Sequence, residues 1–401
     1  MSNSGVVSIT SDLQAHFRRS LLYWVWRKLR ERQQLDAFNT VLDRYLNRDF
    51  EKKAYSEDLI RKRLEAKRSL RRPFFGEDGR PCVVGFGAQQ WERYGLWPTF
   101  GRICDFHLFD YGDWLVRHKV VKPSLEIRRR LASDFVAYVD RIDREHTVTC
   151  AFFYADTAYV GPEVLKAMAE RGIWTVVMGL DDKHRFHERE EFGMRLGQVT
   201  IAPIADLIWT TWKTGAEIFL AAGGTPWYAP EAADPEFYHP IEVPRDLEVV
   251  FVGQCYGIRA DLVRYLRKRG FRVDTFGPGW PRGPVTFEEM VQLYNRAKIT
   301  LGIGSVMSME GVKHLKGRDF EVPMSGGLYL TTYNYELADH YIIGKEILCY
   351  SSFEECAEII HWVLRHPDEA EAIRQAGLRR ARSDHTWERR LQMMFTLFPK
   401  A

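Results

Sequence analysis

The stretch KGRDFEVPMSGGLYLT, Lys316–Thr331, combines a helix start, a helix stop and an apolar run. Pro323 has no N–H group, and in the interior of a helix its ring clashes with the preceding turn, so we place it in the first turn. We therefore expect the helix to begin near residues 317–319. Gly326 and Gly327 can take the left-handed conformation that ends a helix, and GLYLTT predicts a strand.

Three cations lie at the start of this predicted helix: Lys313, Lys316 and Arg318. A helix start offers free N–H groups and the positive end of the helix dipole, so these cations predict an anion site. Glu321 falls in the first turn, where its carboxylate can accept hydrogen bonds from sugar hydroxyls. A ligand in which a diphosphate is joined to a ribose would need both the anion site and the carboxylate acceptor. A surface turn whose charges pair with one another is the alternative.

Outward from this stretch, short apolar runs alternate with helical segments. From about Pro81, the runs CVVGFG, VTCAFFYAD, WTVVMGLDD and DLIWTTW read as strands, and their lack of in–out alternation suits parallel strands covered on both faces. After a proline-rich linker, residues 228–246, the alternation resumes. The pattern predicts two Rossmann-like, doubly wound α/β domains in series.

The expected domains are a basic helical extension (1–72), a first α/β domain (73–240) and a second (241–383), with a C-terminal helix (384–401) returning to the first domain. Residues 1–73 hold 17 Lys and Arg against 9 Asp and Glu, a net charge of +8, whereas the whole chain carries +3. The segment SDLQAHFRRSLLYWVWRKLRER predicts an amphipathic helix. Its apolar stripe packs on the body or a sister subunit, or lies on a membrane surface.

The composition argues against membrane-spanning and secreted proteins. No apolar run reaches the roughly 18 residues that would span a bilayer, and the N-terminal sequence lacks the pattern of a signal peptide. The 6 cysteines are scattered, without CxxC or CxxH. The pattern favours a reduced, cytoplasmic protein without structural zinc.

Further candidates follow other predicted strands of the second half. VFVGQCYGIR places Gly253 after a strand and Arg259 at the next helix start, FGPGW contains Gly277 and Trp280, and LGIGS ends in Ser305. Because the carboxyl ends of parallel strands meet at one edge of a sheet, these residues converge on a ligand crevice. Trp280 either stacks on a flat base or covers the sheet edge.

The first half contributes GLDDKHRF, which contains Asp181, Asp182 and His184 directly after an apolar strand. Carboxylates with a nearby imidazole can perform acid–base catalysis or hold hydroxyl groups. A loop cap is the alternative. The two aspartates are adjacent rather than separated by one residue, so we expect no essential metal.

Several segments together carry a family resemblance. VVFVGQCYGIR, FGPGW, KGRDFEVPMSGGLYLT, GKEI and DHTWERR resemble the C-terminal half of CgeB-like bacterial glycosyltransferases of the GT-B fold, relatives of the retaining family 4. LDDKHRF and PEAADPEFYHP resemble their N-terminal half. The resemblance spans roughly residues 80–397.

The resemblance implies a nucleotide-diphosphate sugar on the second domain, an unidentified acceptor on the first, and a cleft between them. Glu321 matches the second glutamate of the family's E-x7-E motif, which grips the ribose, but Lys313 stands where the first is expected. The expected donor residues are Gly253, Arg259, Gly277, Trp280, Ser305, Lys313, Lys316, Arg318, Glu321 and Gly326. The expected catalytic, acceptor-side residues are Asp181, Asp182 and His184.

We therefore expect a retaining, metal-independent glycosyltransferase with no cofactor besides its donor. Its acceptor is an envelope glycan, a lipid carrier, a protein or a small molecule. A non-catalytic glycan-binding or spore-coat-like structural protein stays open as an alternative, because Lys313 departs from the family pattern. The basic extension leaves open peripheral contact with the inner face of the membrane, and a homodimer also stays open. A nucleic-acid partner is the weaker interpretation.

Overall fold

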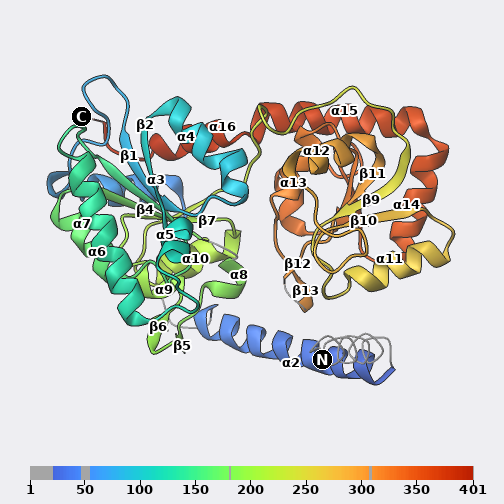
Figure 1. Ribbon diagram of the computed structural model, residues 1–401, viewed down its shortest axis with the longest axis horizontal. Coiled ribbons are helices and arrows are strands. Elements are labelled where there is room, and N and C mark those ends of the chain that lie inside the picture. The colour runs from blue at the N-terminus through green and yellow to red at the C-terminus, as the bar shows by residue number, and fades with distance from the viewer. Residues whose placement is uncertain (1–20, 47–54, 180–181, 307–308, 401) are drawn as a thin grey trace, which may run out of the picture.

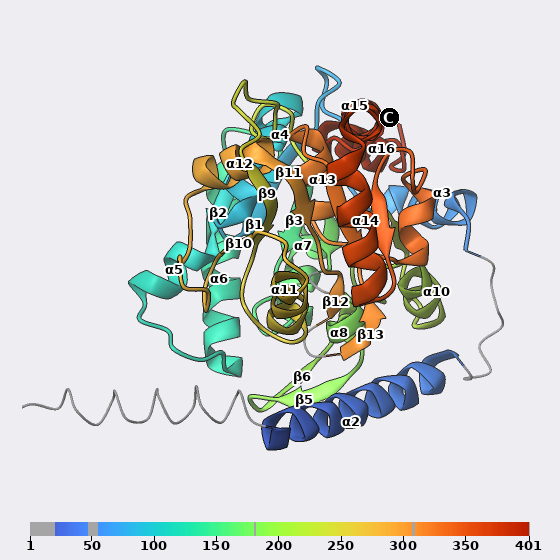
Figure 2. The ribbon, with the colours of Figure 1, turned by 90° about the vertical axis from the view of Figure 1, so that its right-hand side faces the viewer.

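A computed structural model of the chain describes residues 21–46, 55–179, 182–306 and 309–400. It contains two α/β lobes, each built around a parallel sheet (Figure 1). Helix α2 (Leu21–Leu46) runs beneath the two lobes and lies along the hairpins at their lower side (Figures 1 and 2). The strand and helix alternation of the sequence therefore predicted the fold class correctly.

The first sheet has the strand order β2-β1-β3-β4-β7-β8, and all neighbouring strands are parallel. Its strands are β1 (Cys82–Gly87), β2 (Asp105–Asp110), β3 (Cys150–Tyr154), β4 (Trp174–Met178), β7 (Leu207–Thr210) and β8 (Pro226–Tyr228). Alternate residues of β3 enter two different cores, Ala151 and Phe153 in one, Phe152 and Tyr154 in the other. Because both faces are covered, the strands read as continuous apolar runs.

The helices of this domain cover the two faces of its sheet. The core with Phe153 includes residues of α6 (Leu125–Ile142) and α7 (Pro162–Glu170). The core with Phe152 includes residues of α3 (Glu57–Glu65), α4 (Leu96–Ile103) and α16 (Trp387–Phe395). Shorter elements complete the lobe: α5 (Tyr111–Arg117), α8 (Asp182–Arg185), the hairpin β5 (Arg189–Glu191) and β6 (Met194–Leu196), α9 (Gln198–Ile201) and α10 (Lys213–Ala221).

The second sheet has the order β10-β9-β11-β14-β15 and is also parallel. Its strands are β9 (Leu247–Val252), β10 (Val273–Phe276), β11 (Ala297–Leu301), β14 (Tyr329–Thr332) and β15 (Leu348–Tyr350). Residues of α11 (Arg259–Lys268) and α14 (Phe353–Arg365) pack on one face, and residues of α12 (Phe287–Arg296) and α13 (Arg318–Met324) on the other. A hairpin, β12 (Ser305–Val306) and β13 (Met309–Lys313), extends from the sheet.

The chain crosses between the lobes twice. The linker 229–246 contains no strand or helix beyond a single bridge between Ala233 and Thr386. After α15 (Pro367–Asp384), α16 returns to the first lobe, where Trp387 and Leu391 are buried in the core with α4. Within the described ranges no helix is long and apolar enough to cross a membrane.

The helix of the opening stretch differs from its prediction in one respect. It spans Arg318–Met324, so its start agrees, but Pro323 lies in its second turn rather than its first. The helix is so short that the missing Pro323 N–H removes a single hydrogen bond near its end, which the fold tolerates. Gly326 follows with φ +75°, the left-handed conformation that ends the helix.

Candidate functional site

Backbone and side chains approach closely at the carboxyl edge of the second sheet. Gly253 follows β9 with φ +152°, and a Cβ there would lie 2.9 Å from Nη1 of Arg318. A Cβ at Gly277, after β10, would lie 2.5 Å from the Gly253 carbonyl oxygen. Only glycine fits such spacing, so the ends of two strands come together beside Arg318. The predicted convergence of Gly253, Gly277 and Arg318 matches this geometry.

Two arginines meet at this edge. Arg259, at the start of α11, is 3% exposed and donates to the Gln254 carbonyl (2.8 Å) and the Tyr256 hydroxyl (3.0 Å). Arg318, at the start of α13, donates from Nη1 to the Val252 carbonyl at 3.2 Å. Burial, followed by the neighbouring charge of Arg318, lowers the pKa of Arg259 to about 10. The two guanidinium groups therefore repel each other in a poorly solvated place.

No carboxylate in the described part of the chain forms an ion pair with Arg259 or Arg318. The Nε atoms of both are buried and have no hydrogen-bond partner. Burying Arg259 without a counter-charge is costly. For Arg318, neighbouring tyrosines and the acids Glu321 and Asp319 raise the pKa against the effect of burial. A bound anion would remove that cost, so the pair has the properties of an anion site.

Glu321 lies one turn into α13, beside the same edge. Its Oε1 accepts a hydrogen bond from the Tyr238 hydroxyl at 3.0 Å, and burial raises the pKa of its carboxyl group. A Cβ placed on Gly317 would lie 2.8 Å from Glu321 Oε1 and 3.2 Å from Glu231 Oε2. Two carboxylates, one from the linker, therefore face the first residue before α13. Sequence reasoning missed Glu231, because only the folded linker brings it here.

Asp319 fixes the turn that leads into α13. Its two carboxylate oxygens accept hydrogen bonds from the Lys316 backbone N–H and the Tyr329 hydroxyl, both at 2.8 Å. Burial raises the pKa of Asp319 to about 6. These two hydrogen bonds fix the backbone next to Lys316 and Arg318.

Lys313 does not join the predicted cation cluster. Its Nζ donates to the Glu310 carbonyl within β13. Burial lowers the pKa of Lys313, and the charges of Glu310 and Glu31 oppose that shift in part. The amine therefore points toward α2. Ser305 pairs with Lys313 across the hairpin and is 2% exposed. The cluster of cations at the start of α13 is thus smaller than the sequence predicted.

Trp280 and Gly326 have structural roles. Trp280 donates from Nε1 to the Gly253 carbonyl at 2.8 Å, and its ring lies edge-on to Phe251. Of the two sequence-based alternatives, the one in which Trp280 covers the sheet edge agrees with this contact. Gly326 packs against Pro240 at the carboxyl end of α13, opposite to Arg318.

Acceptor-side candidates lie after β4. Asp181 falls outside the described residues. Asp182 is fully buried, and its Oδ2 accepts hydrogen bonds from the Thr210 hydroxyl and, at 3.0 Å, from the Thr211 N–H. This burial favours a positioning role for Asp182 over direct contact with an acceptor. His184 is partly exposed on α8.

The structure brings the acceptor-side segment around α8 close to the segment that precedes α13. The contacts are made by residues that the sequence did not single out. Lys183 Nζ donates to Glu336 Oε2 (2.8 Å) and to the Lys313 carbonyl of the other lobe. His314 Nε2 lies 3.2 Å from the Thr211 hydroxyl, and its Nδ1 is buried without a partner. Burial, then the charges of Lys316 and Lys183, lower the pKa of His314 well below its usual range. The two lobes therefore meet between α8 and the approach to α13.

Comparison with known proteins gives a family-model match to part of the chain and a set of similar folds. Residues 259–396 match the family model described as glycosyl transferase-like, and this segment begins at Arg259 and includes α13. The second half is glycosyltransferase-like. A glycosyltransferase from Rickettsia africae has a TM-score of 0.55 at 8% identity, covering 79% of this chain and 98% of that one. No curated protein matches the chain.

A second similar structure is HepE of Anabaena in complex with UDP and glucose. It has a TM-score of 0.53 at 12% identity and covers 79% of this chain and 99% of HepE. The fold is therefore GT-B, with two Rossmann-like domains, as expected. The family match and the fold support a glycosyltransferase enzyme. The match is to glycosyl transferase-like proteins in general and does not extend to the CgeB-like group or to family 4.

Proposed function

We propose that the protein transfers a sugar from a nucleotide-diphosphate donor held by the second domain to an acceptor held by the first. The observation that carries this proposal is the pair formed by the buried Arg259 and the partly buried Arg318, for which the described part of the chain supplies no carboxylate in an ion pair. Breaking the sugar–phosphate bond leaves a negative diphosphate. Fixed cations stabilise that charge most strongly in the transition state.

The remaining donor contacts follow from the same edge. Glu321 accepts the ribose hydroxyls, with Tyr238 fixing one of its oxygens at 3.0 Å. The backbone after β9 and β10, at Gly253 and Gly277, approaches the phosphates. HepE is similar in fold and is described in complexes with UDP and with UDP-glucose, which makes a uridine donor the first to test.

On the acceptor side, we assign His184 as the group that meets the acceptor hydroxyl, with Asp182 holding its loop. Asp181 stays a candidate by sequence. Retention of configuration rests on the family resemblance. Independence of Mg²⁺ and Mn²⁺ at the donor site is expected, because the two arginines supply the positive charge. Transfer should therefore proceed equally with and without added Mg²⁺ or Mn²⁺.

The decisive experiment measures binding of UDP, GDP and dTDP by calorimetry to the full chain and to Arg318→Ala. We expect at least a hundredfold weaker binding of the preferred diphosphate to Arg318→Ala, and a smaller loss with Arg318→Lys. Arg264→Ala is the matched control, because Arg264 lies on α11 but is 57% exposed and paired with Asp261. Equal diphosphate affinity of the wild type and a folded Arg318→Ala variant would contradict the proposal.

A non-catalytic glycan-binding or structural protein of the same fold is the second candidate. It is favoured by Lys313, which replaces an expected glutamate and is engaged within its own hairpin. Incubation with the preferred nucleotide sugar separates the two. Transfer, or slow hydrolysis of the donor that Arg318→Ala abolishes, excludes this candidate, whereas binding without turnover supports it.

The acceptor and its location are proposals as well. Among the alternatives, a lipid-linked acceptor would give the basic extension a role at an anionic membrane surface. Flotation with vesicles of anionic or neutral lipid, using the full chain and a chain lacking residues 1–46, tests this. Binding to anionic vesicles alone, lost on truncation, is the expected result for a lipid carrier.

A further inference from the structure

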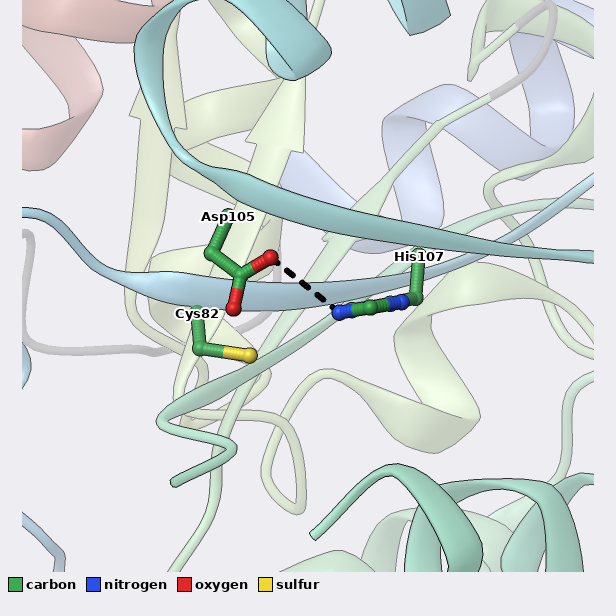
Figure 3. A group of neighbouring side chains, drawn as sticks. All are labelled: Cys82, Asp105 and His107. Carbon is green, nitrogen blue, oxygen red and sulfur yellow. Dashed lines mark ion pairs between the residues drawn. The ribbon is translucent and has the colours of Figure 1, made fainter. Parts of the chain in front are cut away.

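A cluster of metal-ligating side chains lies at the amino-terminal edge of the first sheet, outside the site described above. Cys82 is the first residue of β1, and Asp105 and His107 are the first and third residues of β2. In Figure 3 the Cys82 sulfur, the Asp105 carboxylate and the His107 ring point toward one another. One ligand atom from each lies within 4.8 Å of the other two.

The register of the sheet creates this cluster. β1 and β2 are parallel, with Cys82 opposite Asp105 and Val84 opposite His107. Alternate residues of a strand share a face, so Asp105 and His107 lie on one face beside Cys82. Two hydrogen-bonded strands hold the three side chains, which makes their spacing a property of the fold rather than of a loop.

The three donor atoms are a thiol sulfur, a carboxylate oxygen and an imidazole nitrogen, a set that suits zinc and similar divalent ions. Nε2 of His107 is already 3.1 Å from Oδ1 of Asp105. Ligand atoms around a tetrahedral zinc lie about 3.5 Å apart, because the metal–ligand bonds are about 2.0–2.3 Å. Small side-chain rotations therefore suffice to close the set around one ion.

A fourth residue supports the arrangement from outside. Nδ1 of His146 lies 2.7 Å from the other oxygen of Asp105, and its ring centroid is 4.5 Å from that of His107. Partners of this kind orient metal-ligating carboxylates and are often important for affinity. The next acid, Asp143, is engaged by Arg72 and does not compete for this role.

We propose that Cys82, Asp105 and His107 bind one zinc-type divalent ion, and that His146 positions the Asp105 carboxylate. The ion would join the edge strand β2 to β1, at the end of the sheet opposite to the carboxyl ends of its strands. This site is separate from the donor site. The absence of CxxC and CxxH spacing led to the expectation of no structural zinc. Sequence spacing does not reveal this cluster, because two separate strands bring its residues together.

Binding must release the proton of the Cys82 thiol, because cysteine binds zinc as the thiolate. Calorimetry of Zn²⁺ binding in two buffers of different ionisation enthalpy measures the number of protons released. We expect the Cys82→Ser variant to release no such proton.

The test uses the full chain, freed of any affinity tag and treated with EDTA, and titrates it with Co²⁺. One equivalent should produce a sulfur-to-cobalt charge-transfer band and tetrahedral d–d bands, which Zn²⁺ then displaces. Cys82→Ser should lose the charge-transfer band. His107→Gln should weaken Co²⁺ binding at least tenfold. Cys104→Ser is the matched control, because Cys104 is buried nearby but its thiol donates to the Phe100 carbonyl at 3.1 Å.

Circular dichroism of each variant checks its fold, and His107→Gln is the safer probe because the His107 side chain is 21% exposed. Saturable binding in the wild type and Cys104→Ser, lost or weakened in the two cluster variants, supports the site. Absence of saturable Co²⁺ binding in the wild type overturns the proposal, as does binding that survives both Cys82→Ser and His107→Gln unchanged.

Discussion

At the scale of single residues, the proposed donor site depends on two arginines that form no ion pair with a carboxylate in the described part of the chain. Several buried or half-buried arginines of the described chain pair with carboxylates: Arg71 pairs with Asp206 and Arg128 with Glu163. Arg259 and Arg318 instead donate to carbonyl groups. The positive charge of Arg318 also contributes to lowering the pKa of Arg259. Because repulsion between them disfavours the empty site, an anion with two or more negative charges gains more here than a singly charged one.

Gly317 tests the ribose assignment without removing a charge. Its φ of −46° suits alanine, but a Cβ would lie 2.8 Å from Glu321 Oε1. Gly317→Ala should therefore displace Glu321 and weaken diphosphate-nucleotide binding about tenfold, roughly the 1–1.5 kcal/mol of a displaced hydrogen bond, as measured by calorimetry.

Gly101→Ala is the control for this substitution. Gly101 lies exposed on α4, and a Cβ there meets nothing within 4 Å. It should leave nucleotide affinity unchanged and stabilise the fold by up to about 1 kcal/mol. Unchanged affinity in Gly317→Ala would contradict the placement of the ribose beside Glu321.

Asp319 should make stability depend on pH. Burial raises its pKa in the folded protein to about 6, above the ordinary value of 3.8. Between these values the unfolded chain has lost the proton and the folded chain keeps it, so folding is favoured as the pH falls. From pH 7 to pH 5 this group should add about 1 kcal/mol to the free energy of unfolding.

Urea denaturation of the wild type and Asp319→Asn at both pH values isolates this contribution. Asparagine can still accept from the Lys316 N–H, and its amide can donate to the Tyr329 oxygen. The free energy of unfolding of the wild type, minus that of the variant, should therefore be larger at pH 5 than at pH 7 by about 1 kcal/mol. A difference that is independent of pH would show that Asp319 does not titrate in this range.

At the scale of elements, the short helix α8 connects the lobes through a buried ion pair. Lys183 and Glu336 have side chains that are 6% and 0% exposed, with 2.8 Å between Nζ and Oε2. Lys183→Ala removes the cation that pairs with the buried Glu336, which keeps a hydrogen bond from the Lys213 N–H. We expect it to lower the free energy of unfolding by about 3–5 kcal/mol, as measured by urea denaturation.

Two variants frame this prediction. Lys213→Ala breaks another pair between the lobes, but Lys213 and Asp339 are 56% and 44% exposed, so it should cost less than about 1 kcal/mol. Replacing both partners, Lys183→Met with Glu336→Gln, should recover much of the lost stability. Equal losses in Lys183→Ala and Lys213→Ala would mean that the buried pair has no special role.

Sequence patterns predicted the elements well but missed the pairs between lobes. Continuous apolar runs identify β3 and β4, and the glycine pair marks the end of α13, because those signals are local. Lys183 and Glu336 are 153 residues apart, and no local pattern links them. The direction of the Lys313 side chain could not be predicted from the sequence either, because it depends on which face of β13 meets α2.

Convergence was the successful inference about the site. Strand ends at one edge of a parallel sheet bring Gly253, Gly277 and Arg318 together, and topology alone predicts this. Trp280, in contrast, had two equal interpretations in the sequence. Its hydrogen bond to the Gly253 carbonyl depends on the conformation of the loop, which composition does not specify.

At the scale of the whole molecule, α2 contacts both lobes. Lys28 pairs with Glu310 of the second lobe at 2.7 Å, and Leu35 and Phe38 pack against the apolar side chains of the β12–β13 hairpin. Toward its other end, the Tyr45 ring lies 5.4 Å from Phe186 of the first lobe. The same hairpin leads directly to His314, Lys316 and α13. We therefore expect this helix to restrict the opening of the lobes.

Leu35→Asp should release this restriction while both domains remain folded. The charge would enter the apolar contact in which Leu35 packs against Val306, Met309 and Val312 of the β12–β13 hairpin. Small-angle scattering should then report a larger radius of gyration without nucleotide. The Michaelis constant for the donor should rise severalfold, because part of the binding energy must then close the lobes.

Leu29→Asp provides the comparison for this experiment. Leu29 lies on the same helix but is 59% exposed, so a charge there removes no contact between the lobes. It should leave both the radius of gyration and the Michaelis constant at wild-type values. If Leu35→Asp behaves like Leu29→Asp, α2 does not control the cleft, and closure depends on the contacts of Lys183 and His314 alone.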